Sequence, residues 1–331
     1  MKRILIGILI VMLIILVVVL WTDKKSPDTT PDIPNNNTNV EDTNNNQPDE
    51  PDNELTLNLS NDGTVAVWWW HKDDADVKYR ENYLSFLEKN SVNEIYIDWH
   101  DFEKSELADF VIDAGKHGMK VSFLAGEAEW VLPDNNDFDA VLDAYLEYQA
   151  WASPEARLSS LHLDVEPHQL KTFKDDKNLH IQYFADFVVD VTKKIRAAND
   201  RIEWDVTFWY DEYDVTNEYG ETENFVRLLA RNSDALCIMS YRDSVAGMLD
   251  CASYEIEVCK EYNRKIILGL ETKSDEGDKV SFMEEGRKEM YGVCEIIFAD
   301  LAKKFGTGNY GVAIHHLNTW YRLEDEYING R

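Results

Sequence analysis

Two carboxyl side chains, Asp164 and Glu166, stand two residues apart at the end of an apolar run. If this run is a strand, both point to one face, because side chains alternate between the two faces. Ionising two neighbouring carboxyls is unfavourable, so the pKa of one of them is expected to be raised. A carboxyl that stays protonated near neutral pH suits a general acid for glycosidic-bond cleavage. Glu166, directly before Pro167, is the stronger candidate, whereas Asp164 has a hydrogen-bonded strut as its alternative role.

The elements that would position this pair alternate regularly from Gly63 onward. β-branched and aromatic runs alternate with amphipathic stretches, which is typical of βαβ units and a parallel sheet. We expect eight strands, at residues 64–70, 94–100, 120–125, 160–166, 202–209, 235–241, 265–271 and 310–316. Helices are expected near residues 77–90, 104–117, 138–151, 180–198, 222–232, 245–262 and 281–305, with a short one after Thr319.

This repeat predicts an α/β fold with a single (β/α)8 TIM barrel over residues 54–331. The alternative, an open doubly wound sheet, would be expected to have a glycine-rich first turn. The chain instead has Trp68-Trp69-Trp70-His71 at that place. The barrel is therefore the preferred fold.

The alternation within each strand separates side chains that face the helices from those that face the barrel interior. In strand 160–166 the apolar residues share one face, so His162 and the two acids are expected to point inward. Active sites of this architecture lie at the C-terminal ends of the strands. Residues expected there, as contacts for a substrate, are Trp70, Asp98, His100, Asp205, Trp209, Tyr241, Arg242, His315 and Trp320.

Aromatic rings at strand ends suit a carbohydrate, because their faces stack on the apolar faces of sugars. Trp70, Trp209 and Trp320 are the candidates for such stacking. Trp68 and Trp204 are expected to fill the core instead.

The run Leu163-Asp164-Val165-Glu166 resembles the tail of the D-x-x-D-x-D-x-E motif of chitinase-like, family 18 glycoside hydrolases. Met239-Ser240-Tyr241 is similar to the M-x-Y element of that family. The resemblance implies that Glu166 is the acid, that Asp164 orients the acetamido group of the substrate, and that Tyr241 hydrogen-bonds it. Counting back from Glu166, the first two aspartates of the motif fall on Ser159 and His162.

A second resemblance is to retaining glycosidases of the large barrel clan A, which have an acid/base Glu after strand four and a nucleophile Glu after strand seven. Val165-Glu166-Pro167 and Gly269-Leu270-Glu271 occupy those places. This resemblance implies that Glu271 is the nucleophile, so the second catalytic element remains open between Glu271 and Asp164. Most of the predicted barrel is also similar to uncharacterised bacterial barrel proteins grouped with glycoside hydrolases.

Two other classes of function compete with a hydrolase. One is a catalytically inactive barrel that binds a glycan or a protein at the cell surface, because this fold hosts many activities. The other is a metal-dependent polysaccharide deacetylase or amidohydrolase, which the histidines near the strand ends suggest. The sequence has neither H-x-H in the first strand nor H-E-x-x-H, so no metal is expected. Motifs for a serine nucleophile elbow, a P-loop and a dinucleotide site are also absent, and no cofactor is expected.

Composition restricts the partners. The 331 residues contain 33 Lys and Arg against 63 Asp and Glu, for a formal net charge of −30. Such an excess of carboxylates would repel phosphate backbones, so nucleic acid is not an expected partner and a polysaccharide or oligosaccharide is. Four cysteines are too few for a disulfide framework, although a bridge between Cys259 and Cys294 stays open.

The N-terminus predicts attachment to a membrane. Ile4–Leu20 is uninterrupted by charge and follows Lys2 and Arg3, which is typical of an uncleaved, single-pass signal anchor over residues 1–22. Residues 23–53 are rich in Asn, Pro and acids, with only Ile33 and Val40 as aliphatic residues. This composition predicts a disordered linker. We therefore expect the barrel to lie outside the cell membrane, or to be secreted if the segment is cleaved.

Overall fold

The computed structural model describes residues 55–70, 77–99, 103–274, 277 and 279–326. The expected signal anchor and linker lie outside these residues, as does His100. Within the described ranges, no helix is both long enough and apolar enough to span a membrane.

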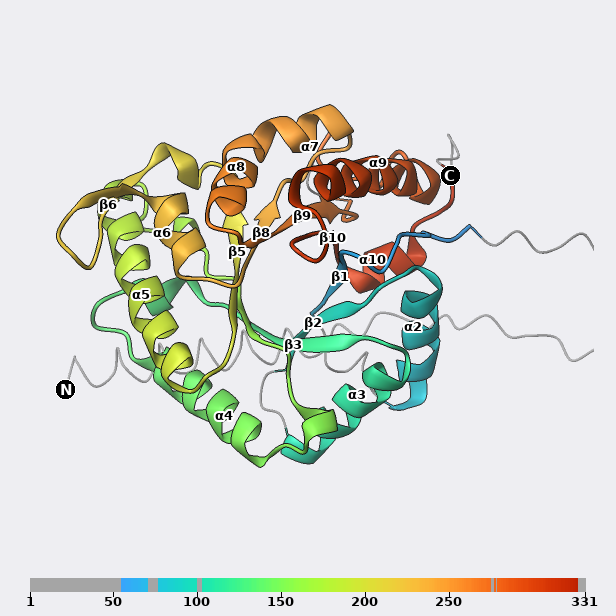
Figure 1. The fold of residues 1–331 in the computed structure, drawn as a ribbon, viewed down its shortest axis with the longest axis horizontal. Coiled ribbons are helices and arrows are strands. Elements are labelled where there is room, and N and C mark those ends of the chain that lie inside the picture. The colour runs from blue at the N-terminus through green and yellow to red at the C-terminus, as the bar shows by residue number, and fades with distance from the viewer. Residues whose placement is uncertain (1–54, 71–76, 100–102, 275–276, 278, 327–331) are drawn as a thin grey trace, which may run out of the picture. The chain divides into compact units, whose positions relative to one another are not determined.

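Eight parallel strands close into a barrel, which confirms the predicted fold (Figure 1). Their order around the barrel is β1-β10-β9-β8-β5-β4-β3-β2. Each begins within one residue of its predicted start and most end earlier than predicted, because the last residues leave the ladder at the barrel mouth. The strands are β1 (Thr64–Trp69), β2 (Glu94–Asp98), β3 (Lys120–Ala125), β4 (Leu161–Leu163), β5 (Ile202–Thr207), β8 (Ala235–Met239), β9 (Lys265–Glu271) and β10 (Tyr310–His315).

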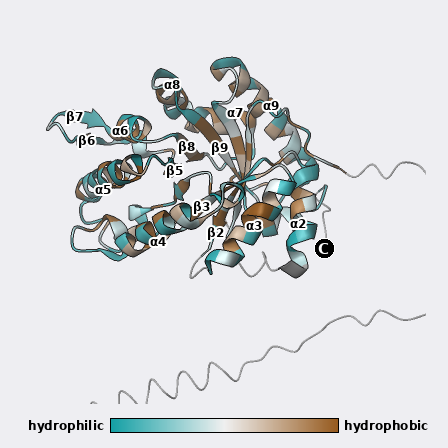
Figure 2. Ribbon diagram, turned by 60° about the horizontal axis from the view of Figure 1, so that its bottom comes forward, coloured by the Kyte–Doolittle hydropathy of each residue, from teal (hydrophilic) through white to brown (hydrophobic). Residues whose placement is uncertain are grey.

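Helices surround the strands. They are α2 (Val77–Lys89), α3 (Lys104–Lys116), α4 (Asp137–Trp151), α5 (Lys177–Ala197), α6 (Phe225–Arg231), α7 (Val245–Cys251), α8 (Ser253–Glu261), α9 (Arg287–Phe305) and α10 (Leu317–Arg322). Short 3-10 helices are η2 (Ala128–Val131), η3 (Pro154–Ala156), η4 (Pro167–Gln169) and η5 (Tyr210–Glu212). Figure 2 shows hydrophobic strands inside and hydrophilic outer surfaces on the helices, as burial of apolar surface requires.

Helix α5 shows why these segments become helices. The Asp176 side chain caps its start by accepting a hydrogen bond from the Leu179 amide at 3.0 Å, which satisfies one of the free amides of the first turn. Ile181, Phe184 and Val188 recur at three- and four-residue spacing and are buried. One face of α5 therefore packs on the barrel while the other meets solvent.

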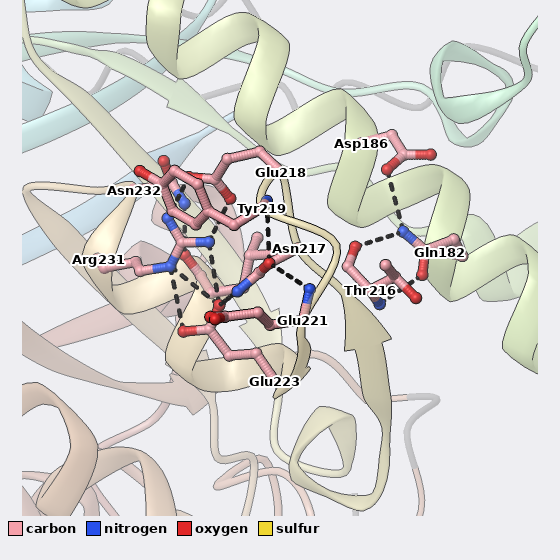
Figure 3. Close-up of polar contacts among 11 residues, drawn as sticks. Gln182, Asp186, Thr216, Asn217, Glu218, Tyr219, Glu221, Glu223, Arg231 and Asn232 are labelled. Carbon is pink, nitrogen blue, oxygen red and sulfur yellow. Dashed lines mark hydrogen bonds and ion pairs between the residues drawn. The ribbon is translucent and has the colours of Figure 1, made fainter.

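The sequence prediction of a helix over residues 222–232 was wrong at its beginning. Residues Asp214–Thr216 (β6) and Thr222–Asn224 (β7) form an antiparallel hairpin, and α6 starts only at Phe225. The Asn224 side chain accepts a hydrogen bond from the Val226 amide and so caps α6 there. Arg231 pairs with Glu218 and Glu223 and ties the hairpin to α6 (Figure 3).

Two apolar layers make up the core. The larger lies between strands and helices and includes Trp204, as predicted. The smaller fills the barrel interior and consists of Ala66, Trp68, Tyr96, Leu124, Cys237, Ile267 and Ala313. All four cysteines lie in the described part of the chain and are free, so the bridge between Cys259 and Cys294 is not formed.

Candidate active site

The end of β4 places the two candidate acids at the C-terminal mouth of the barrel. The Asp164 amide donates to the Ala125 carbonyl of β3 at 3.0 Å, one residue beyond the end of β4. Gly126 directly follows Ala125, and a Cβ atom added to Gly126 would lie 1.7 Å from the Asp164 carbonyl oxygen. Only glycine allows this close approach of the two backbones, and it holds Asp164 against the end of β3.

Asp164 is the carboxyl of the pair whose proton affinity rises. Burial raises the pKa of Asp164 well above its usual range, the Asp205 and Glu166 carboxylates raise it further, and His162 opposes them. One Asp164 oxygen, Oδ1, is buried and has no hydrogen-bond partner among the described residues. The prediction that one member of the pair has a raised pKa is therefore confirmed for Asp164.

Glu166 lies further out, where solvent reaches it. Its side chain is 20% exposed, and the His168 Nε2 atom lies 3.6 Å from its Oε1. The Gln169 side-chain amide donates to Oε2. Burial lowers the pKa of His168, which favours a neutral ring beside Glu166. The turn η4, begun by Pro167, brings these neighbours back to the carboxyl.

Trp209 lies beside this group. Its ring centroid is 5.4 Å from that of His168 and 6.2 Å from that of Phe173, and the side chain is partly exposed. His168 and Gln169 were not among the predicted site residues. The signal that could have found them is the Pro167 turn, which returns the chain toward the preceding side chain.

Glu271, His315 and Trp70 form a hydrogen-bonded chain on the β1, β9 and β10 side of the mouth. Trp70 donates its indole N–H to His315 Nε2 at 2.8 Å, and His315 Nδ1 lies 2.8 Å from Glu271 Oε2. An indole N–H can only donate, so Nε2 of His315 accepts, and Nδ1 carries the proton that is donated to Glu271. The Thr272 and Lys273 amides donate to the other Glu271 oxygen. All the oxygens of this buried carboxylate are thus occupied by donors.

Tyr241 lies against this chain, with its ring centroid 5.8 Å from that of His315. Burial raises the pKa of Tyr241 well above its usual range, and the Glu271 carboxylate adds to the shift. Its hydroxyl therefore stays protonated and can donate. A Cβ atom on Gly269 would lie 3.1 Å from the Tyr241 ring, so glycine leaves room for the ring.

Arg242 and Asp98 lie at the rim. The Arg242 guanidinium donates to the Tyr241 carbonyl at 2.7 Å and stacks over the Phe208 ring, 4.9 Å from its centroid. Asp98 ends β2 and is partly exposed. Asp205 is instead buried below the mouth, where its Oδ2 accepts the Trp68 indole N–H at 2.9 Å. It does not face solvent, in contrast to the predicted substrate contact.

The prediction that Trp320 contacts substrate was wrong. Its side chain is 0% exposed, and its indole N–H donates to the Tyr291 hydroxyl at 3.1 Å. Its ring packs edge-on against Phe86, 5.0 Å away. Trp320 lies in α10, whose apolar side chains pack among the helices, so its ring is turned away from the mouth.

Cavities with defined linings lie at several places among the described residues. One of about 590 Å³ lies at the N-terminal ends of the strands, around Gly63, Glu94, Lys120 and Lys265. A second of about 370 Å³ is mostly apolar and is lined by residues that include Asp98, Trp99, Phe123, Trp130 and Val141. A third of about 700 Å³ is a shallow surface site beside α9 and α10.

The described residues contain no group of three His, Cys, Asp or Glu side chains placed to hold a metal ion. The functional groups that the described residues bring to the mouth are carboxyls, imidazoles, a phenol and indoles. These groups can donate, accept and transfer protons.

Comparisons with known proteins extend no further than the fold. No protein-family model matches the sequence, and no curated protein matches it. A plant class V chitinase mutant from Cycas revoluta, in complex with (GlcNAc)3, is 12% identical with a TM-score of 0.48; the match covers 77% of this chain and 95% of that chain.

Two solved structures with other activities have slightly lower TM-scores at about the same identity. D-psicose 3-epimerase from Clostridium cellulolyticum H10 is 13% identical with a TM-score of 0.44, covering 76% of this chain and 84% of that one. A mutant tryptophan synthase alpha-subunit from Pyrococcus furiosus is 13% identical with a TM-score of 0.44, and the match covers 78% of this chain and 89% of that one. All three TM-scores are below 0.5, so the assignment of the barrel rests on the strand pairing of this chain itself.

Proposed function

We propose that the chain is a glycoside hydrolase that cleaves a polysaccharide or oligosaccharide at the C-terminal mouth of the barrel, with Glu166 as the proton donor. The observation that carries this proposal is the pairing of two carboxyls after β4 in different environments. Both side chains are partly exposed; the Oδ1 atom of Asp164 is buried and desolvation raises the pKa of this carboxyl, whereas 20% of the Glu166 side chain is exposed. A pair of neighbouring carboxyls is typical of glycosidic-bond cleavage. Glu166 is assigned as the donor because it follows Asp164 toward the opening of the barrel, and the protonated Asp164 is the neighbour from which it can be supplied with a proton.

Asp164 is the better candidate for the second catalytic element. It lies two residues before Glu166, directly after the end of β4, and its Oδ1 has no hydrogen-bond partner among the described residues, so this oxygen can accept a bond from or donate one to a substrate group. The Glu271 carboxylate is buried and accepts from His315 and from two backbone amides. A nucleophile would have to leave these donors, so we assign Glu271 to positioning His315 and, through it, Trp70.

Trp209 and Tyr241 support a carbohydrate substrate. The partly exposed Trp209 ring stands beside His168, which neighbours Glu166, and can stack on a sugar face. The Tyr241 hydroxyl, held protonated by burial, can donate to a sugar oxygen.

The test uses the purified full chain on chitin-type, peptidoglycan-derived and neutral glycans, with release of reducing ends as the readout. We expect Glu166→Gln to lower kcat by about 100-fold or more, because a general acid contributes at least that much. Asp164→Asn should have a comparable effect, and Glu271→Gln a smaller one. The matched control is Glu129→Gln, an exposed carboxyl on η2. Full turnover by Glu166→Gln would contradict the proposal.

A second candidate function is a catalytically inactive barrel that binds a glycan. The observation in its favour is that Glu271, the other candidate for a second catalytic carboxyl, is buried and already accepts hydrogen bonds from His315 and two backbone amides. This function predicts binding without turnover on every glycan of the panel, with binding retained by Glu166→Gln and weakened by Trp209→Ala.

We further propose that residues 1–22 anchor the chain in a membrane as a single-pass helix and that residues 23–53 tether the barrel on the extracytoplasmic side. The support is the uncharged apolar run Ile4–Leu20 after two basic residues. The full chain should then remain with membranes after an alkaline wash, and external protease should degrade the barrel in intact cells. A full-length chain in the soluble fraction would contradict the anchor, and a shortened chain in the medium would show cleavage.

A further inference from the structure

An apolar cavity that the proposed mechanism does not use lies beside the mouth of the barrel. It has a volume of about 370 Å³ and is lined by the ends of β2 and β3 and by α4. Asp98, the last residue of β2, and Ala125, the last residue of β3, belong to this lining. The Ala125 carbonyl accepts a hydrogen bond from the Asp164 amide at 3.0 Å. The cavity is therefore separated from the candidate acids by a single backbone contact.

Aromatic rings and small side chains make up most of the lining. Trp99, Phe123 and Trp130 contribute the rings, and these residues are 3%, 5% and 8% exposed. Helix α4 contributes Val141 and Ala144, which are partly exposed. Because the side chains on α4 are short, they leave space in front of the rings that solvent can enter. Such a surface favours an apolar group over water.

One polar atom in the lining lacks a partner. The indole N–H of Trp99 is buried and has no hydrogen-bond partner among the described residues. An indole nitrogen can only donate, and a buried donor that stays unpaired costs free energy. A ligand that fits this lining therefore combines an apolar body with a hydrogen-bond acceptor.

The charged side chains of the lining disfavour an acceptor that is an anion. Lys104 Nζ lies 3.1 Å from Glu147 Oε2, so this cation already has an anionic partner. The Asp98 carboxylate, which also lines the cavity, would repel a second carboxylate. A neutral carbonyl suits the lining better, and this separates an acyl amide or ester from a free fatty acid.

We propose that this cavity binds an acyl group longer than acetyl, carried by the glycan as an amide or an ester, and that the acyl carbonyl accepts a hydrogen bond from Trp99. The inference rests on the proposed function for the sugar at the mouth. The size of the acyl group follows from the volume, because a water molecule occupies about 30 Å³ in the liquid. The cavity has space for roughly twelve groups of that size, so an acetyl group would fill only a small part of it.

The first test measures binding by calorimetry with the purified full chain. The probes are N-acyl glucosamines with acyl groups of increasing length from acetyl to octanoyl. We expect the dissociation constant to fall about three- to four-fold for each added CH₂ group until the cavity is filled. Octanamide should bind more tightly than octanoate, because it offers the carbonyl without the charge. A dissociation constant that is independent of acyl length, or octanoate that binds as tightly as octanamide, would overturn the proposal.

The second test locates the acyl group with variants in the same buffer. Trp99→Phe keeps a ring but removes the N–H, and should weaken binding of N-octanoyl glucosamine about five-fold or more. Ala144→Phe fills the cavity from its partly exposed side and should abolish the gain with acyl length. The matched controls on α4 are Trp151→Phe and Ala150→Phe, both at exposed positions outside the lining, and they should leave binding unchanged. A folded Ala144→Phe that still gains affinity with acyl length would overturn the proposal.

Failure of this inference and failure of the proposed hydrolase give different results. If no glycan is turned over but affinity rises with acyl length and Ala144→Phe removes the rise, the acyl site stands and the hydrolase fails. If glycans are turned over and Glu166→Gln stops this, while acyl length has no effect on binding, the hydrolase stands and the acyl site fails.

Discussion

A single buried acid shows how strongly the environment of a residue governs its protonation in this molecule. Glu255 in α8 is fully buried, and neither of its carboxyl oxygens has a hydrogen-bond partner among the described residues. Burial raises the pKa of Glu255 to about 8. A protonated carboxyl at this position is compatible with an apolar surrounding, whereas a carboxylate there would be unpaired.

The raised pKa of Glu255 predicts that the stability of the protein depends on pH. The folded pKa of Glu255 lies above the value of about 4.5 in the unfolded chain. The contribution of protonated Glu255 to the free energy of unfolding is therefore fully present below pH 4.5 and is lost as pH rises toward 8. The loss amounts to at most about 1.4 kcal/mol per pH unit in that window. Glu255→Gln stays neutral, so its stability relative to the unmodified chain should increase between pH 5 and pH 8.

Urea unfolding at pH 5, 6, 7 and 8 measures this difference. Glu257→Gln, an exposed glutamate of the same helix, is the control and should follow the unmodified chain at every pH. Parallel curves for Glu255→Gln and the unmodified chain would show that Glu255 is not protonated in the fold.

At the scale of elements, the junction of β3 and β4 depends on one glycine. Gly126→Ala would place a Cβ atom 1.7 Å from the Asp164 carbonyl oxygen, so the two strand ends must separate. We expect a loss of stability of at least about 2 kcal/mol and, because Asp164 moves, a loss of any activity at the mouth.

Gly115→Ala is the control for this substitution. Gly115 lies in α3, and nothing is within 4 Å of its added Cβ, so alanine should be neutral or stabilise by up to about 1 kcal/mol. Thermal unfolding of both variants measures the effect. Equal stability of Gly126→Ala and the unmodified chain would contradict the tight junction.

The β6–β7 hairpin depends on Arg231, which binds Glu218 and Glu223 from one guanidinium (Figure 3). Arg231→Ala leaves these two acids without their cation, so amide exchange in residues 214–224 should accelerate, with a loss of about 1 kcal/mol or more in stability. Arg227→Ala, on the same helix, breaks a more exposed pair with Glu261 and should cost less than about 1 kcal/mol. Equal exchange rates in the two variants would show that the hairpin is held by its backbone alone.

At the scale of the whole molecule, the net charge of −30 predicts self-repulsion. Added salt screens this repulsion, so the thermal midpoint should rise by a few degrees between about 10 mM and 500 mM NaCl at pH 7.5. The control is pH 4.5, where the net charge of the sequence passes through zero and the rise should vanish. A midpoint that falls with salt at pH 7.5 would indicate that attractive ion pairs outweigh the repulsion.

The sequence alone determined the barrel and the inward side of its strands. Strand faces are encoded locally, because neighbouring side chains alternate, and for this reason the pairing of Asp164 with Glu166 and the burial of Trp204 could be predicted. The β6–β7 hairpin could not, because residues 222–224 are the polar run Thr-Glu-Asn, which has no alternating strand pattern, and they directly precede the apolar residues of α6. Only the Asn224 cap marks where the helix begins.

The tertiary structure alone decided which inward side chains meet. Trp70 and His315 are 245 residues apart in the sequence, and they touch because β1 and β10 close the barrel. Trp320 is buried because α10 turns it toward Phe86, and His162 lies between Glu203 and Asp205 because β4 and β5 pair in one register. Strand periodicity specifies the face of a side chain, whereas its depth and partners depend on strand order, register and helix packing, which are long-range properties of the fold.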